Sequence, residues 1–411
     1  MTRRGKHTLA LAIGLYLAAW GFGTRAMYPV AVGLAAVPVL AWLWVRLTAR
    51  PTTLRRKTGR RELVEGGRVL VQVDIRAEGG VLPARATMLE TVGDLGEREV
   101  ALRQRGHSLR GSYAIDPAPR GRYTLETAEL RVDDPLGMAE SRTPLGRSDT
   151  LLVYPRVYEL DGLFTDAGST GGDEGRALLH RTAGYDLHSI RDFQQGESLR
   201  RVHWRSTAKR RKLMVKELTE MPRDESAVLL DCDSAAAVGP PGASSFDAQV
   251  RCAASLLNSL VGTGQRCSLV LHGRTRRRIR IHAGGGEWGT ALAALAAVRA
   301  DADRPLATML RDSLGATGAA EAIDAARLYV VTGAMTMELA TRLLALRTVR
   351  REVALVWIDA PSFAGALRAP GAPDAASLRL AQSGVDIAHL VAGGDVVSAL
   401  SSAVRRRAGV G

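Results

Sequence analysis

The densest set of chemically capable side chains lies in residues 184–217. The sequence there, GYDLHSIRDFQQGESLRRVHWRSTAKRRKLMVKE, combines acids, arginines, lysines, two histidines, a tryptophan and a phenylalanine. Guanidinium and ammonium groups bind carboxylates or phosphates, an aromatic ring can anchor a contact, and histidine can carry a proton. No nucleophile or metal-ligand pattern accompanies His203, so these residue types favour a binding surface over a catalytic centre.

The spacing within this segment predicts a short helix that presents its cations in rows. Gly196 breaks the chain, and Ser198 can cap the helix that follows. Side chains three and four apart share a helix face, which places Arg201, Arg205 and Lys209 in one row and Arg200 beside Trp204 in another. Residues 212–220, KLMVKELTE, alternate like a strand. We therefore predict a partner-binding surface made of Arg200, Arg201, His203, Trp204, Arg205 and Lys209.

Four other residues of the segment are predicted to shape it. Asp186 and Arg191 are expected to form an ion pair, with Asp192 as the alternative acid. Phe193 is expected to anchor the segment against a neighbouring domain, and Gly196 to end the preceding element.

The order of these residues resembles the bacterial family known as domain of unknown function 58. Members have the pattern GxDFxSLRxYxPGDxxRxIHWxxxAR, which residues 184–209 follow with conservative variants. The resemblance implies a membrane-tethered protein, often encoded beside a MoxR-type AAA+ ATPase, with no established catalytic activity. It suggests a membrane-anchored cytoplasmic adaptor or scaffold that acts with that ATPase, in assembly or chaperone-like processes.

The charge distribution argues against nucleic acid as the partner. The net charge is +14 and the isoelectric point about 10.4, values that are common in nucleic-acid-binding proteins. However, residues 1–61 contain eleven of the 56 Lys and Arg residues and no acid, which leaves 45 bases against 42 acids in the rest. Because the excess is concentrated near the N-terminus, we expect a lipid bilayer to be the surface it serves.

Two apolar runs, residues 8–23 and 27–47, predict a transmembrane helical hairpin within residues 1–60. The second run is long enough to cross a bilayer core, and the first is at the short end of the range. Basic residues flank both ends of the pair, which places both ends in the cytoplasm of a multi-pass protein of the bacterial cell membrane. A signal peptide is the alternative, although no clear cleavage site follows the first run.

The remaining chain divides into two predicted domains joined by the cationic segment. Residues 61–157 carry short alternating strands broken by Gly and Pro, which favours an immunoglobulin-like β-sandwich. Residues 158–183 have the composition of a flexible connector. In residues 218–411 apolar strands alternate with amphipathic helices, typical of a doubly wound α/β sheet whose sites lie at the strand carboxyl ends.

The first such strand ends in Asp231-Cys232-Asp233-Ser234-Ala235, which resembles the metal-ion-dependent adhesion site of von Willebrand factor A domains. The first, third and fifth residues of that motif supply oxygens to Mg²⁺. Here Ala235 and Gly333 stand where oxygen donors are expected, so we predict a degenerate site at Asp231 and Asp233, no resident cofactor, and weak Mg²⁺ binding at most. Two alternatives remain open: a Mg²⁺-dependent enzyme using Asp231, Asp233 and His203, and a nucleic-acid-binding protein using residues 201–212.

Overall fold

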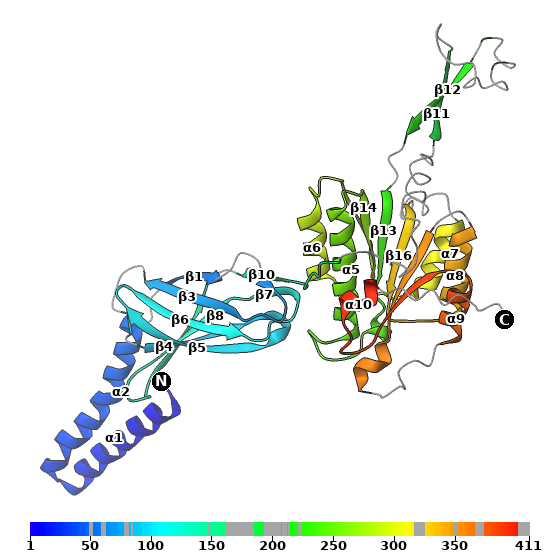
Figure 1. Ribbon diagram of the computed structural model, residues 1–411. Coiled ribbons are helices and arrows are strands. Elements are labelled where there is room, and N and C mark those ends of the chain that lie inside the picture. Colours follow the sequence, from blue (N-terminus) through cyan, green and yellow to red (C-terminus); the bar gives the residue numbers. More distant parts are fainter. Residues whose placement is uncertain are drawn as a thin grey trace. The chain divides into compact units, whose positions relative to one another are not determined.

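The computed structural model describes residues 1–48, 52–58, 63–77, 82–83, 85–146, 148–160, 185–192, 207, 212, 214–220, 224–315, 325–348, 352–365 and 374–401. The chain forms two compact units, Met1–Tyr154 and Pro155–Gly411 (Figure 1).

The first unit begins with two packed helices, α1 (Arg3–Phe22) and α2 (Tyr28–Thr48), joined by the short 3-10 helix η1 (Arg25–Met27). Gly23 ends α1 in the left-handed conformation, with φ of 66°, which glycine adopts without steric cost. The rings of Tyr16 and Tyr28 meet edge to face, 5.3 Å apart. The prediction of two helices is therefore confirmed.

One of these helices has the properties of a membrane span. Among the described residues, only the stretch Arg25–Thr48, with a mean hydropathy of 2.0, is long and apolar enough to cross a bilayer. The first turns of α1 carry Arg3, Arg4 and Lys6, which lower its hydropathy. The structure thus shows one apolar N-terminal helix of spanning length, and a second span stays a prediction.

Two sheets follow in this unit, a larger antiparallel sheet and a smaller mixed one. The larger has seven antiparallel strands in the order β1-β3-β6-β5-β4-β8-β9. Their bounds are Thr52–Thr58 (β1), Val69–Ala77 (β3), Ser108–Ile115 (β6), Glu97–Arg105 (β5), Arg85–Thr91 (β4), Ala128–Asp133 (β8) and Glu140–Leu145 (β9). The smaller sheet has the order β2-β10-β7, with β2 at Leu63–Val64, β10 at Asp149–Tyr154 and β7 at Gly121–Leu125. The predicted series of short strands is confirmed, except that residues 122–132, expected to form one strand, form β7 and β8 in different sheets. Strands β1, β2 and β9 were not predicted.

The two sheets enclose one apolar core, and the larger one is curled. Alternate residues of β3, such as Val71 and Ile75, are fully buried against Leu125 and Val153 of the smaller sheet. Gly146, just after β9, has φ of 76°, and a Cβ atom there would lie 3.0 Å from the side chain of Leu54 in β1. The two edge strands of the seven-stranded sheet therefore approach each other.

A buried ion pair crosses this core. The Arg56 Nε atom of β1 lies 2.5 Å from Glu90 Oε1 of β4, and the two side chains are 6% and 0% exposed. Arg56 also donates to the carbonyl of Glu126 at 2.9 Å. Burial and the neighbouring Glu90 carboxylate together raise the pKa of Tyr113 far above its ordinary value. The basic run that the charge analysis assigned to the membrane flank thus includes a strand whose central arginine is structural.

The second unit contains a six-stranded sheet of order β15-β14-β13-β16-β17-β18, parallel except for β15. Its strands are Asp224–Asp231 (β13), Cys267–His272 (β14), Arg276–Ile281 (β15), Ala325–Thr332 (β16), Glu352–Ile358 (β17) and Asp386–Leu390 (β18). Its helices are α5 (Ser245–Gly262), α6 (Trp288–Ala297), α7 (Leu306–Gly315), α8 (Met337–Thr348), α9 (Ala375–Gln382) and α10 (Val396–Ser401). The predicted mostly parallel α/β sheet is confirmed, and α7 was not predicted.

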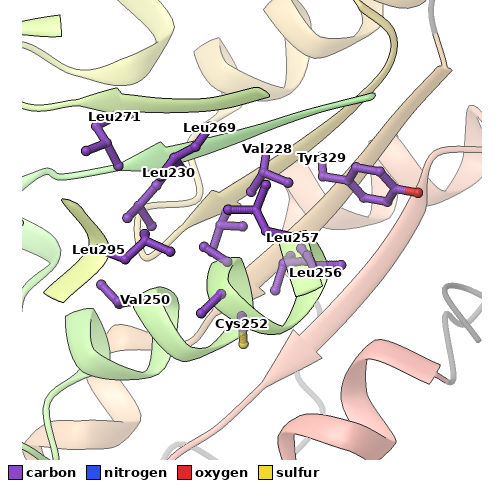
Figure 2. Packing of buried hydrophobic residues seen from close by; sticks show 14 of the residues in the cluster. Val228, Leu230, Val250, Cys252, Leu256, Leu257, Leu269, Leu271, Leu295 and Tyr329 are labelled. Carbon is purple, nitrogen blue, oxygen red and sulfur yellow. The ribbon is translucent and has the colours of Figure 1, made fainter. Parts of the chain in front are cut away.

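Helices cover both faces of this sheet (Figure 1). One layer contains α5, α6 and α10, and the other contains α7, α8 and α9. Figure 2 shows the first layer, in which strand side chains meet those of α5 and α6, among them Val228, Leu230, Leu269, Val250, Leu257 and Leu295. A capping box between Ser244 and Asp247 starts α5, because each residue's side chain accepts a hydrogen bond from the other's backbone N–H.

The buried ion pair generates the first prediction. Arg56→Met should lower the free energy of unfolding by about 3 to 5 kcal/mol, because it leaves the Glu90 carboxylate buried without its counter-charge. The double variant Arg56→Met/Glu90→Leu should recover most of that loss. Urea denaturation of the full-length protein in detergent, followed by circular dichroism, measures both effects.

Arg142→Met is the matched control. Arg142 pairs with Glu140 at 2.5 Å, but its side chain is 59% exposed, so its loss should leave the free energy of unfolding almost unchanged. Equal losses from Arg56→Met and Arg142→Met would contradict a special role for the buried pair.

Candidate functional site

The cationic segment is carried by a two-stranded hairpin. Strand β11 (Tyr185–Asp192) pairs antiparallel with β12 (Met214–Glu220), with an irregularity between Leu187 and Ser189. The two strands form a sheet of their own, and within the described ranges neither pairs with the six-stranded sheet. The predicted strand at residues 212–220 is confirmed, whereas β11 was not predicted because its sequence has no regular alternation.

The register of this hairpin defines where the connection begins and ends. Asp192 lies opposite Met214, so residues 193–213 leave and re-enter the hairpin at adjacent positions. Near the return, the buried Met214 donates its backbone N–H to the Thr207 hydroxyl at 3.0 Å. The connection is therefore tied to the first residue of β12.

Most of the predicted binding residues fall within this connection. Asp186 and Arg191 lie in β11, opposite Thr219 and Val215, and their ion pair stays a prediction. Eight other predicted residues lie outside the described residues: Phe193, Gly196, Arg200, Arg201, His203, Trp204, Arg205 and Lys209. The helix expected after Ser198 lies there too, apart from Thr207, which is helical.

A second group of chemically capable side chains lies at the carboxyl ends of the parallel strands. Residues paired in register on parallel strands point to the same face, and here that is the face covered by α7, α8 and α9. Asp231 of β13 pairs with His272 of β14. On the other side of β13, Leu230 pairs with Val331 of β16, so Thr332 lies beside Asp231. Thr332 in turn pairs with Trp357 of β17, and Trp357 pairs with His389 of β18. We call this set the carboxyl-edge row: His272, Asp231, Thr332, Trp357 and His389.

The carboxylate of Asp231 is the centre of this row. Its side chain is almost fully buried, and its Oδ2 atom accepts a hydrogen bond of 2.7 Å from the Thr332 hydroxyl. Its Oδ1 atom is buried with no hydrogen-bond partner. Burial raises the pKa of Asp231 from 3.8 to about 6, although the Thr332 hydrogen bond and the nearby His272 act in the opposite direction. The site thus holds an acid that titrates close to neutral pH.

The two histidines of the row are held by different contacts. His272 is buried, with Nε2 2.9 Å from the carbonyl oxygen of Arg304. His389 stacks on Trp357 with ring centroids 4.3 Å apart. Burial lowers the pKa of His389, and the carboxylate of Asp359 partly offsets that effect. Both rings therefore have defined orientations.

The donors around Asp231 do not match the Mg²⁺ site of von Willebrand factor A domains. Asp233 accepts a hydrogen bond of 2.9 Å from the Ala235 backbone N–H and so caps the 3-10 helix η4 (Ser234–Ala236). A Cβ atom on Gly333 would lie 2.7 Å from Gln249 Nε2 and 3.0 Å from Ala236 Cβ, so no donor side chain fits there.

The remaining donors are few. Among the buried oxygens without a hydrogen-bond partner, Asp231 Oδ1 ends β13, Asp359 Oδ1 follows β17 and Gln249 Oε1 lies on α5. Hard cations take six or more oxygens. Within the described ranges there is no cluster of three His, Cys, Asp or Glu side chains suited to a metal. Weak Mg²⁺ binding at Asp231 and Asp233 stays a prediction.

Sequence analysis missed four members of the carboxyl-edge row. It predicted a site residue at Asp231 but not at His272, Thr332, Trp357 or His389. The signal was present, because β13, β14 and β16 are apolar runs that each end in a polar residue. Strand order was needed to show that these ends are neighbours.

The raised pKa of Asp231 makes a prediction about pH. Between pH 3.8 and about 6 the folded protein holds a proton that the unfolded chain releases, so this stabilisation is fully present below pH 3.8 and lost as pH rises through about 6. The unfolding free energy of the wild type relative to Asp231→Asn should therefore rise by about 1.4 kcal/mol from pH 7 to pH 5. Urea denaturation monitored by tryptophan fluorescence measures the difference.

Thr332→Val provides the control. It removes the hydrogen bond that favours the ionised carboxylate, so the midpoint of the pH effect should move to higher pH. A wild type and an Asp231→Asn variant whose stabilities change in parallel with pH would contradict the assignment.

Solved structures of other proteins show only limited similarity to this chain. Two solved structures with limited similarity are the alkylpurine DNA glycosylase AlkC of Pseudomonas fluorescens bound to DNA and Cwp6 from Clostridium difficile. The first is 11% identical, with a TM-score of 0.15, and covers 33% of this chain and 41% of its own. The second is 8% identical, with a TM-score of 0.16, and covers 74% of this chain and 36% of its own. Scores this low carry no argument about fold or function.

A curated relative gives a clearer match. The chain is 26% identical over 232 residues to the uncharacterized protein YeaD of Bacillus subtilis strain 168. The match covers 56% of this chain and 55% of YeaD, so the chain spans about half the length of that relative.

A family model described as protein of unknown function DUF58 matches residues 189–362. The match begins inside β11 and ends just after β17, so it contains both the cationic hairpin and most of the α/β sheet. The chain is a member of the DUF58 family.

Proposed function

We propose that this protein is a membrane-anchored adaptor that docks a partner protein through the connection of the β11–β12 hairpin. The observation that carries the proposal is the hairpin itself. It brackets the cation-rich residues 193–213 on a separate two-stranded sheet, apart from the strands that build the α/β core. A cationic surface carried by a separate hairpin suits recognition of an acidic surface on another protein. The family resemblance suggests a MoxR-type AAA+ ATPase as that partner.

The finer fold assignments belong to the same proposal. Two sheets around one core support an immunoglobulin-like sandwich for the first unit. In the second unit, the chain enters the sheet at β13, adds β14 on one side and β16 on the other, and ends β13 with an acid. That order supports a doubly wound, von Willebrand factor A-like domain.

The membrane anchor is supported by the exposed side chains of both helices. Leu17, Trp20 and Phe22 of α1 are more than half exposed, as are Val30, Val32 and Leu40 of α2. A lipid environment would bury these groups, so we propose that α1 crosses the bilayer together with α2 and that the soluble units are cytoplasmic.

The enzyme alternative has less support. Asp233 caps a 3-10 helix, and the Asp231 carboxylate is bound to Thr332 inside the fold. Asp231 is therefore buried away from a substrate in the described geometry, and Asp233 already has a capping role. Nucleic acid is not proposed either, because the charge outside residues 1–61 is nearly balanced.

The docking proposal is tested by charge reversal. If Arg201 and Arg205 form the exposed row predicted from the sequence, Arg201→Glu/Arg205→Glu should leave the free energy of unfolding within about 1 kcal/mol, since exposed substitutions typically change it by less than about 0.5 kcal/mol each. The variant should no longer co-purify with its ATPase partner from the native host, whereas the wild type should. A melting curve is recorded beside the co-purification.

Arg277→Glu/Arg280→Glu is the matched control, since both side chains are exposed in β15 of the same unit. It should retain the partner. An unfolded Arg201/Arg205 variant would assign the row a structural role, and a folded variant that retains its partner would refute docking by this row.

The topology is tested separately with reporter fusions. Fusions after Arg61 and at the C-terminus should both report the cytoplasm, because basic residues flank the helical pair on its two outer ends. A periplasmic C-terminus would contradict the two-span anchor. Release of a soluble form cleaved near Gly23 would instead identify the first helix as a signal peptide.

A further inference from the structure

The turn between β8 and β9, residues 134–139, is rigid. The buried Asp134 carboxylate accepts hydrogen bonds from the backbone N–H groups of Leu136 at 2.9 Å and Ala139 at 2.6 Å. Backbone bonds join Asp134 N to Ala139 O and Gly137 N to Asp134 O. Gly137 has φ of 67°, a conformation that glycine adopts readily. These contacts fix the direction in which Leu136 is presented.

The turn holds the base of the helical pair. Thr2 donates its backbone N–H to Met138 O at 2.9 Å and its hydroxyl to Gly137 O at 2.7 Å. A Cβ atom on Gly5 would lie 2.3 Å from Met138 O, so only glycine allows this approach. Ala139 packs with Ala41 and Val45 of α2. The turn therefore lies level with the first turn of α1 and the last two turns of α2.

The position of that contact can be compared with the thickness of a bilayer. The apolar stretch starts at Arg25. At about 1.5 Å per residue, Ala41 lies about 24 Å and Val45 about 30 Å along the helix from Arg25. A hydrocarbon core is about 30 Å thick. A hydrocarbon core that begins at Arg25 therefore ends close to the level of the β8–β9 turn.

The side chains at this level suit a membrane interface. Trp42 and Trp44 are exposed, and the guanidinium of Arg46 lies 5.0 Å from the centre of the Trp42 ring. Arg3 and Arg4 are exposed at the start of α1. Tryptophan and arginine are enriched where acyl chains meet headgroups.

Leu136, at the tip of the β8–β9 turn, is a large apolar side chain whose exposure the fold does not explain. It is 59% exposed, more than the other large hydrophobic side chains exposed in the described β strands and turns, Val64 at 45% and Leu70 at 37%. We propose that Leu136 inserts into the headgroup region of the bilayer, so that the β8–β9 turn is a lipid-contacting surface that fixes the first unit against the membrane. The inference rests on the proposed anchoring of α2.

Site-selective labelling tests this in the full-length protein reconstituted in lipid nanodiscs. The three native cysteines, Cys232, Cys252 and Cys267, are fully buried, so a thiol introduced at the surface can be labelled selectively. An environment-sensitive fluorophore is placed on Leu136→Cys. It should lose more fluorescence to lipids with a nitroxide near the headgroup than to lipids with a nitroxide at the acyl end, and less to aqueous iodide than a label on Val64→Cys.

Leu40→Cys separates this inference from the anchor. Leu40 is 63% exposed on α2, and its label should be quenched by lipid nitroxides if α2 spans the bilayer. The label at residue 40 could be quenched while the label at residue 136 behaves like the one at residue 64. That result would overturn the inference about Leu136 but would still support the membrane anchor. A label at residue 136 shielded from iodide but unaffected by either lipid would indicate a protein contact there, which also overturns it. No quenching at residue 40 would refute both the anchor and the inference.

Discussion

The register of the parallel strands is the constraint on which the second unit depends. Parallel strands must be covered on both faces, since their crossover connections place helices there. Here the ladder from β14 through β13, β16 and β17 to β18 brings five strand ends to one edge. Asp231, His272 and Thr332 are distant in sequence and become neighbours only through that pairing. The buried acid, its hydrogen bond and its raised pKa all follow.

The same constraint leaves no room for a donor side chain at position 333, beside the end of β16. The sheet and its helices fill the space around Asp231 with the protein's own atoms, including Gln249 and Ala236 beside Gly333. A carboxylate in such surroundings pairs with Thr332 and is easier to protonate. The hairpin differs, because β11 and β12 pair with each other and form a sheet separate from the six-stranded one. The docking that we propose therefore uses the hairpin rather than the edge of the six-stranded sheet.

In the first unit a short turn links the apolar helices to the curled sheet. Asp134 organises this β8–β9 turn through its hydrogen bonds, and the turn contacts Thr2, Gly5 and α2. A rigid joint of this kind limits how far the sheet can move relative to its own helices. The interior of the same unit depends on Arg56 and Glu90, whose charges compensate each other across the core.

The sequence by itself determined the elements whose pattern is local. Alternation in β3 and β6, the apolar stretch of α2 and the amphipathic pattern of α5 are readable because burial imposes periods of 2 and 3.6 residues. Asp231 was readable as an acid at a strand end. Strand β1 was not, because its sequence TTLRRKT is polar and pairs only because β3 offers a free edge and Glu90 an acid for Arg56. Strand order likewise decided the carboxyl-edge row and the closed space at Gly333, since both depend on contacts between residues about a hundred positions apart.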